Sequence, residues 1–218
     1  MVSVCELHAR IALQCSDLNE FNQVQTKLMY LYRMGLSGAC NEFIALRILY
    51  YVCLTMNAKY VSGSSDLVYT LQDLSPIQYQ DDQIKFALQI RASVQTQNYL
   101  SFFRLSTQTT NESFKYLLNT ILPQIRLKYL CIMAKAYRPT LSLQYMIETM
   151  KFNSFEEAMV FFKSTDCVIL KGKTILTTKD LWTKAGNIKV SESLSPDLVI
   201  DMTKTVVNTD PDVAGTLL

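Results

Sequence analysis

Apolar residues recur every three or four positions through the first half of the chain, which is the spacing of amphipathic α-helices. Gly and Pro number only 6 and 5 in 218 residues, so few tight turns are expected and an all-β sandwich is disfavoured. The pattern predicts helices over about residues 2–14, 17–34, 41–56, 66–74, 82–95 and 99–105. They form three helix pairs of roughly 30–40 residues each, the length of a tetratricopeptide-like repeat. Such pairs bury their apolar faces by stacking, which predicts a superhelix over residues 1–123.

The first helix carries His8, the single histidine of the chain. We place His8 on the inner, apolar face of this helix, and we expect Glu6 and Arg10 to form an ion pair on another face. His8 and Cys5 lie about one turn apart, which is compatible with half of a metal site or with a Cys–His catalytic pair. The additional ligands or orienting groups that either site requires are not visible, so a core histidine is favoured. The expected inner face consists of Val4, Cys5, His8, Ile11 and Ala12.

Arg47 and Arg91 interrupt apolar helical faces, so each is a candidate for ligand binding. A buried guanidinium usually needs a carboxylate nearby, and Asp17 or Glu20 is available for Arg47. Structural ion pairs are therefore favoured over ligand binding for Arg47 and Arg91. The aromatic clusters allow base stacking, but helical spacing favours packing between helices for Tyr50, Tyr51, Tyr99, Phe102 and Phe103.

A long helix precedes a change of pattern at Pro139. A long helix is predicted from Glu112 to Arg138, with a kink or break at Pro123 because proline removes a backbone donor and clashes with the preceding turn. Asn41, Asp17 and Ser154 are predicted helix caps, the last two with glutamate partners three residues later.

Three short elements follow and resemble a helix-turn-helix relative. Short helices are predicted over about 142–150 and 154–163. Two strands, 167–170 and 174–177, are split by a turn containing Gly172, which predicts a hairpin. Helices followed by such a hairpin describe a winged helix.

Charge is unevenly distributed along the chain. The overall net charge is +2, but residues 1–123 are neutral, residues 124–190 carry +6 and residues 191–218 carry −4. We therefore divide the chain into a helical repeat subdomain (1–123), a winged-helix subdomain (124–190) and an acidic C-terminal tail or helix (191–218). The basic subdomain is predicted to bind nucleic acid through backbone contacts, with little sequence preference. A solvated basic face is the alternative. The predicted nucleic-acid-binding residues are Lys128, Lys135, Arg138, Lys163, Lys171 and Lys173.

The hairpin has a second predicted use, because an edge strand offers unpaired backbone groups to a partner strand. Strand side chains alternate between faces, so some members of this set must face the core of the module. The predicted partner-interface residues are Val168, Leu170, Ile175 and Leu176.

Several functional classes are disfavoured by the sequence. No phosphate-binding loop, nucleophile elbow, histidine-rich metal motif or dinucleotide fingerprint occurs, so we expect neither an enzyme nor a cofactor. The six cysteines are scattered and are interpreted as reduced core residues. The N-terminus lacks the pattern of a signal peptide. The most apolar run, 48–56, is too short to span a bilayer, which predicts a soluble intracellular protein.

Several stretches resemble the SAC/GANP branch of the PCI-domain family, whose plan is a helical array followed by a winged helix. The His8-Ala9-Arg10-Ile11-Ala12-Leu13 stretch, with Asp17 and Glu20-Phe21-Asn22-Gln23, resembles the most distinctive motif of that branch. Arg47-Ile48-Leu49-Tyr50-Tyr51, Asn98-Tyr99 with Phe102-Phe103-Arg104-Leu105, and Ala136-Tyr137-Arg138-Pro139 are similar to later motifs. The resemblance covers about residues 2–177, most closely to the leukocyte-receptor-cluster member eight and THP-three-type subfamily. Family members carry a longer helical region before the first motif, so the chain is expected to correspond to part of such a protein.

The resemblance implies a nuclear scaffold in transcription-coupled messenger-RNA biogenesis. It implies pairing with a second PCI-domain protein and a small acidic DSS-type protein, and binding of RNA or DNA by a composite winged-helix surface. The alternative is a pure protein–protein scaffold of the proteasome-lid, signalosome or initiation-factor type, without nucleic-acid binding.

Overall fold

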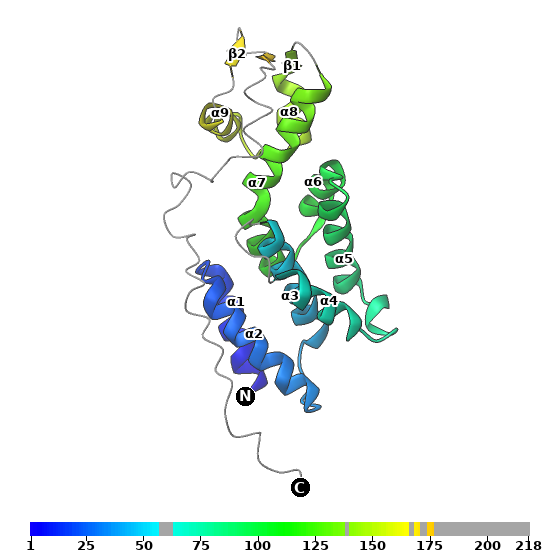
Figure 1. Cartoon of the computed structure of the whole chain (residues 1–218). Helices are drawn as coiled ribbons and strands as arrows, with labels where there is room; N and C mark the ends of the chain where they lie inside the picture. Colours follow the sequence, from blue (N-terminus) through cyan, green and yellow to red (C-terminus); the bar gives the residue numbers. More distant parts are fainter. Residues whose placement is uncertain (57–62, 138–139, 166–167, 171–173, 177–218) are drawn as a thin grey trace.

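The structure is a computed structural model and describes residues 1–56, 63–137, 140–165, 168–170 and 174–176. These residues are mostly helical, as the periodicity predicted (Figure 1). The helices are α1 (Val2–Gln14), α2 (Leu18–Arg33), α3 (Cys40–Met56), α4 (Gly63–Gln72), the 3-10 turn η1 (Gln78–Gln80), α5 (Asp82–Gln95), α6 (Tyr99–Gln108), α7 (Glu112–Ala136), α8 (Leu143–Thr149) and α9 (Phe155–Ser164). The strands are β1 (Thr140–Ser142), β2 (Val168–Leu170) and β3 (Thr174–Leu176).

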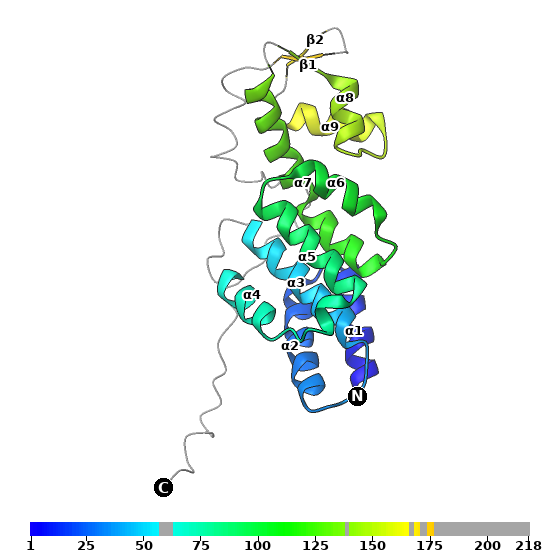
Figure 2. The same ribbon diagram turned by 90° about the vertical axis from the view of Figure 1, so that its right-hand side faces the viewer.

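Helices α1–α6 form one end of the molecule, and α8, α9 and the sheet form the other, with α7 joining the two (Figures 1 and 2). Helix α1 packs against α2, and α5 packs against α6. Helix α3 lies at the centre, in contact with α4, α5 and α7. Its residues from Phe43 to Leu54 are buried on nearly all sides, as its uniformly apolar sequence predicted.

The predicted inner face of α1 is only partly confirmed: Cys5 and Ala12 are buried, whereas Val4, His8 and Ile11 are exposed. His8 is exposed, with 52% of its side chain accessible, and its Nε2 lies 3.2 Å from Oε1 of Glu20. The helix is apolar on more than one side, so periodicity alone did not fix which stripe faces the core. Val4, Leu7 and Ile11 point outward, and the buried stripe consists of Val2, Cys5, Glu6, Ala9, Ala12 and Leu13.

Glu6 lies in the interior and not in the predicted pair with Arg10. Its Oε1 accepts hydrogen bonds from the Tyr32 hydroxyl at 2.7 Å and from the backbone N–H of Ala39 at 2.7 Å. Tyr32 lies in the last turn of α2 and Ala39 directly precedes α3, so this carboxylate links the two ends of the α2–α3 connection. Gly38 lies directly against the carboxylate, where a Cβ would overlap Glu6 Oε1 and lie 2.6 Å from Val2 Cγ1.

Arg10 pairs with α3 instead. Its Nη2 lies 2.7 Å from Oε2 of Glu42, and its guanidinium stacks over the ring of Phe43 at 5.2 Å from the ring centroid. The Asn111 side chain also donates to Glu42, at 3.4 Å. Glu42 therefore links α1, α3 and the start of α7.

Helix starts follow the predicted capping chemistry in most cases. Asp17 accepts from the N–H of Glu20, and Ser154 accepts from the N–H of Glu157. Asn41 is the exception, because α3 begins one residue earlier and the Asn41 amide donates to Asp81, the cap of α5. This bond ties the start of α3 to the start of α5.

Helix α7 continues through Pro123 without the predicted break, and it crosses the division that the sequence placed between residues 123 and 124.

Residues 138–139 lie outside the described part, and β1 then precedes α8. Strand β1 was not predicted, because Thr140-Leu141-Ser142 is too short to show alternation. The three strands form an antiparallel sheet in the order β1-β3-β2. The predicted hairpin is confirmed, with Val168 opposite Leu176 and Leu170 opposite Thr174.

We expect Gly38→Ala to destabilise the fold by about 1–3 kcal/mol, because the methyl group overpacks the Glu6 contact. Urea unfolding of the variant measures this loss. Ser37→Ala, one residue away and exposed, is the matched control and is expected to change stability by less than about 0.5 kcal/mol. Equal midpoints for the two variants would show that Gly38 is not sterically constrained.

Candidate nucleic-acid and partner interface

Arg126 of α7 holds the C-terminal elements in place. Its side chain is only 6% exposed. Nη1 lies 2.6 Å from Glu157 Oε1, Nε donates to the Met150 carbonyl at 3.3 Å, and Nη2 donates to the Lys151 carbonyl at 3.0 Å. The guanidinium also stacks on Phe152, at 3.7 Å from the ring centroid. One side chain of α7 therefore binds both the end of α8 and the first turn of α9.

The helix termini make these contacts possible. Lys151 has a φ of 53°, a left-handed conformation that ends α8 and leaves its carbonyl available to Arg126. Glu157 lies in the first turn of α9, where a negative charge is favoured. Its Oε2 accepts from the backbone N–H of Asn153 at 3.0 Å.

Burial alone would raise the pKa of Glu157, but the hydrogen bond from Arg126 and the Asn153 N–H outweigh burial and lower it. Burial lowers the pKa of Arg126 against the opposing effect of Glu157. An arginine side chain remains charged at any ordinary pH, so the pair is ionic near neutrality.

Aromatic and aliphatic side chains complete the packing of α9. Phe152 contacts Phe161 and Phe162, with ring centroids 5.5 and 5.9 Å apart. Phe162 and Ala158 are fully buried. The sheet contributes Leu141 and Ile175 to the same core. We call residues 124–176 the C-terminal module, since α7, α8, α9 and the sheet share this packing.

The predicted nucleic-acid-binding residues are placed unevenly. Lys135, in the last turn of α7, and Lys163, in the last turn of α9, are exposed. Lys128 is half-buried, and its Nζ lies 3.8 Å from the sulfur of Met56 on α3, so its side chain is directed toward the helical array. Arg138, Lys171 and Lys173 lie outside the described residues.

The predicted partner-interface residues lie on the hairpin. Val168 and Leu170 are on β2, an edge strand, whereas Ile175 and Leu176 are on β3, the central strand. The side chain of Ile175 is fully buried. This agrees with the prediction that, because strand side chains alternate between faces, some of the four residues face the core. A partner strand can add only at β1 or β2, because β3 is paired on both sides.

The other singled-out side chains are structural. Arg47 stacks over Tyr51 at 5.4 Å and makes no ion pair with Asp17 or Glu20, so that predicted pairing was wrong. Asp17 caps α2, and Glu20 lies against His8. Packing of the aromatic clusters is confirmed, since all their members are buried: Tyr50, Tyr51, Tyr99, Phe102 and Phe103.

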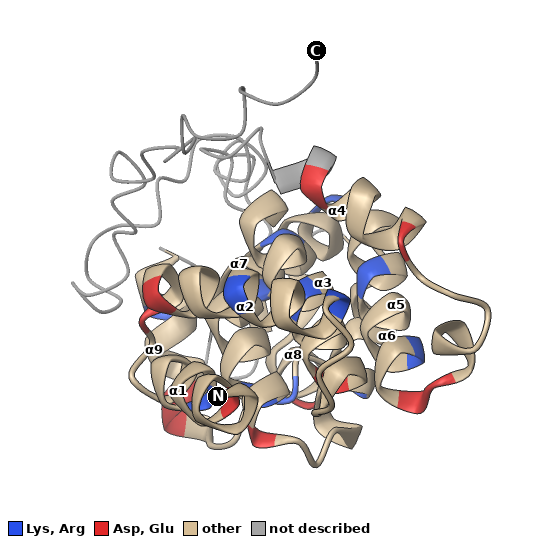
Figure 3. Ribbon diagram, turned by 90° about the horizontal axis from the view of Figure 1, so that it is seen from below, with Lys and Arg blue, Asp and Glu red and all other residues tan. Residues whose placement is uncertain are grey.

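The described cysteines lie in different environments. Cys5, Cys53 and Cys131 are buried, but Cys15 is exposed, contrary to the prediction of a core position. Within the described ranges, no three metal-ligating side chains are grouped. Figure 3 views the molecule from below and shows basic and acidic positions interspersed.

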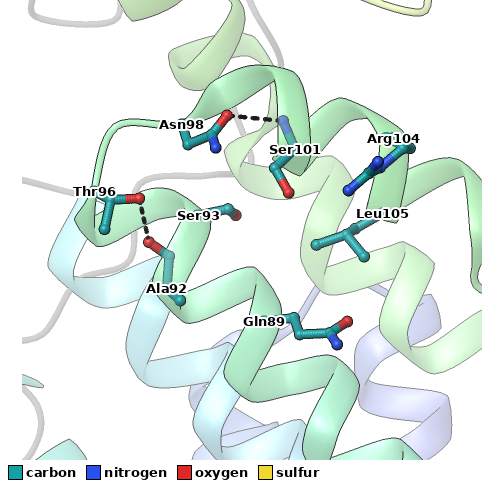
Figure 4. A pocket seen from close by; sticks show the side chains of 8 residues that line it. All are labelled: Gln89, Ala92, Ser93, Thr96, Asn98, Ser101, Arg104 and Leu105. Carbon is teal, nitrogen blue, oxygen red and sulfur yellow. Dashed lines mark hydrogen bonds between the residues drawn. The ribbon is translucent and has the colours of Figure 1, made fainter.

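A polar hollow of about 350 Å³ lies between α5 and α6 (Figure 4). Three of its polar side chains bond to the backbone of α5 and α6. Thr96 donates to the Ala92 carbonyl, Ser93 donates to the Ile90 carbonyl, and Asn98 accepts from the N–H of Ser101. The hollow therefore lies at the junction between the end of one helix and the start of the next.

Sequence reasoning missed a tyrosine cluster in the C-terminal module. Tyr129 is buried on α7, whereas Tyr137 and Tyr145 are exposed. Burial raises the pKa of the Tyr129 phenol, and Tyr145 and Tyr137 raise it further. The signal available in the sequence was the recurrence of tyrosine at 129, 137 and 145.

Comparisons with known proteins place the chain in a family. Residues 3–171 match the SAC3/GANP family. The chain is 34% identical over 167 residues to a THP3 homolog of Schizosaccharomyces pombe, covering 77% of this chain and 40% of that protein. It is 36% identical over 160 residues to the Leukocyte receptor cluster member 8 homolog of Xenopus laevis, covering 73% of this chain and 19% of that protein.

A third relative, Protein THP3 of Saccharomyces cerevisiae, is 28% identical over 192 residues, covering 87% of this chain and 39% of that protein. The chain therefore belongs to the SAC3/GANP family, and within it to the subfamily that includes these THP3-type and leukocyte-receptor-cluster relatives. It spans less than half the length of each of these relatives. No helix in the described ranges is long and apolar enough to cross a membrane.

Replacing Arg126 with methionine is expected to loosen α8 and α9. The change leaves Glu157 without its partner and two carbonyls without donors, which costs about 2–3 kcal/mol. Hydrogen exchange should accelerate in α8 and α9 and remain unchanged in α1–α3. Arg33→Met is the matched control, because the Arg33–Asp73 pair is exposed at both side chains and such pairs contribute little. Unchanged protection of α8 and α9 in Arg126→Met would contradict this role.

The Glu157 contribution should depend on pH. Because its pKa is lowered in the folded state, its stabilisation is present above the ordinary value of 4.5 and is lost as pH falls through the folded value. The difference in unfolding free energy between the wild type and Glu157→Gln should therefore be constant from pH 7 to about 5.5 and narrow below 4.5. Denaturant unfolding at several pH values measures it. A difference that stays constant down to pH 3 would argue against an ionic pair.

Proposed function

We propose that this chain is a non-enzymatic PCI-type scaffold of a nuclear complex in transcription-coupled messenger-RNA biogenesis. In this proposal it pairs with a second PCI-domain protein and a small acidic DSS-type protein. It binds RNA or DNA through the basic surface of the C-terminal module. Family membership supports assignment to the scaffold class. The observation that supports the binding role is the C-terminal module, which Arg126 holds on α7.

The order of elements in this module supports a winged helix. A helix, a strand, two helices and a hairpin follow one another, with the strands in the order β1-β3-β2. In a helix-turn-helix relative, the second helix of the pair and the hairpin are the elements that approach nucleic acid. The preceding helix pairs would then form the TPR-like array of a PCI domain.

Charge supports contact with phosphates. Lys135 and Lys163 are exposed on the module, and no ion pair of either is found among the described residues. The hairpin turn adds Lys171 and Lys173 in sequence. Since each lysine that contacts a phosphate releases counterions, binding should be salt-dependent and weakly selective for sequence. Lys128 is the weakest member of the set, because its side chain is directed toward Met56.

Backbone pairing at the sheet edge supports the partner role. The outer edge of β2, with Val168 and Leu170, is the position where a strand of a second subunit would extend the sheet. Affinity isolation followed by mass spectrometry tests this half of the proposal, which requires a second PCI-domain protein among the recovered chains.

Charge reversal of the hairpin turn tests nucleic-acid binding. Lys171→Glu with Lys173→Glu is expected to weaken binding to a single-stranded oligonucleotide about tenfold or more. The slope of log affinity against log salt should become shallower by about 0.7 per lost contact. Fluorescence anisotropy from 50 to 200 mM salt measures both quantities.

The matched control is Lys27→Glu, an exposed lysine of the helical array. It should leave affinity within twofold of the wild type. If the double variant and the control bind equally well, the hairpin turn is not the nucleic-acid contact. If the wild type shows no binding at all, the pure protein–protein scaffold is the correct function.

A further inference from the structure

Helix α1 exposes a line of apolar side chains on the side opposite its buried face. Val4 is 70% exposed, Leu7 is 58% exposed and Ile11 is 45% exposed. Because residues three and four apart are neighbours on a helix surface, these three side chains follow one line along α1. We call them the α1 stripe.

The charged side chains of α1 do not lie on this line. They are Glu6, which is buried and bonded to the α2–α3 connection, and Arg10, which pairs with Glu42. His8, beside the stripe, lies 3.2 Å from Glu20. The outward face of α1 is therefore apolar at its centre, where an exposed helix normally carries charged or polar side chains.

The position of α1 leaves the stripe accessible. Helix α1 lies at the end of the molecule away from the sheet (Figure 1). Its neighbours α2 and α7 cover the buried side of the helix, whereas the stripe stays exposed. A helix that is apolar on both sides is normally covered on both, and a continuous apolar patch marks an interaction surface, unlike single exposed apolar residues.

The spacing and the residue types favour an identical helix as the occupant. With Val4 at position a of a heptad, Leu7 is at d and Ile11 is at the next a. β-Branched residues at a combined with leucine at d favour the pairing of two parallel helices. The flanking positions e and g hold His8 and Arg10, each beside a glutamate of its own chain. Residues 1–123 carry no net charge, so two copies approach through this face without net repulsion.

We propose that the α1 stripe packs against the same stripe of a second copy of this chain, as two parallel helices related by a twofold axis. This surface belongs to the helical array and goes beyond the proposed function, on which it does not depend. The stripe spans only about two helical turns, so the dimer is weak, with a dissociation constant of about 10–300 μM.

Sedimentation equilibrium of the full chain from about 5 to 500 μM tests the pairing. The average mass of the wild type should rise toward twice the monomer mass over this range. Leu7→Glu places two carboxylates opposite each other at position d and should raise the dissociation constant about tenfold or more. Leu7 is exposed in the monomer, so the variant should keep the circular dichroism spectrum of the wild type.

Leu100→Glu is the matched control, because Leu100 is 51% exposed in the first turn of α6. Its dissociation constant should stay within twofold of the wild type. A wild type that remains monomeric at every concentration would overturn the proposal. Equal dissociation constants for Leu7→Glu and Leu100→Glu would also overturn it, because the dimer would then use another surface.

Disulfide formation tests the parallel orientation. In a parallel pair each position of the stripe faces its own copy. Val4→Cys and Ile11→Cys, each combined with Cys15→Ser, should therefore both give covalent dimers under air oxidation. Covalent dimers from neither variant would contradict the parallel arrangement.

Discussion

The contacts of the Arg126 guanidinium are the interaction on which the arrangement of α8 and α9 on α7 depends. It projects from the middle of α7 and joins the end of α8, the start of α9 and the ring of Phe152. Without a cation at that point, the carbonyls of Met150 and Lys151 would lose their donors, and Glu157 would lose its counterion. The exposed lysines Lys135 and Lys163 lie on α7 and α9, so their relative placement depends on this contact.

A large part of the fold could be predicted from the sequence, because capping residues mark where several helices begin. Asp17 and Ser154 each sit three residues before a glutamate, and these pairs mark the starts of α2 and α9. The apolar character of α3 predicted its central position. The hairpin was visible because two β-branched runs flank a glycine. Each of these signals is local, which is why a single sequence contains it.

The remaining features depend on contacts between distant residues. Glu6 and Arg10 are four residues apart, which is the spacing of an ion pair along a helix. In the structure, Glu6 accepts from the backbone of Ala39 in the α2–α3 connection, and Arg10 pairs with Glu42 of α3. Arg126 has no sequence feature that distinguishes it from a surface arginine, and its partner Glu157 is 31 residues away. Of the predicted binding residues, Lys135 and Lys163 are exposed, whereas Lys128 turns toward α3.

Under the proposed function, the central claim is that nucleic acid contacts the C-terminal module and not the helical array. Photochemical crosslinking of a 4-thiouridine oligonucleotide to the protein, followed by peptide mapping, tests that claim most directly. The account predicts crosslinked peptides within residues 128–176, lost when unlabelled single strand is added in excess. Crosslinks confined to α1–α6, or crosslinks that excess competitor leaves unchanged, would contradict it.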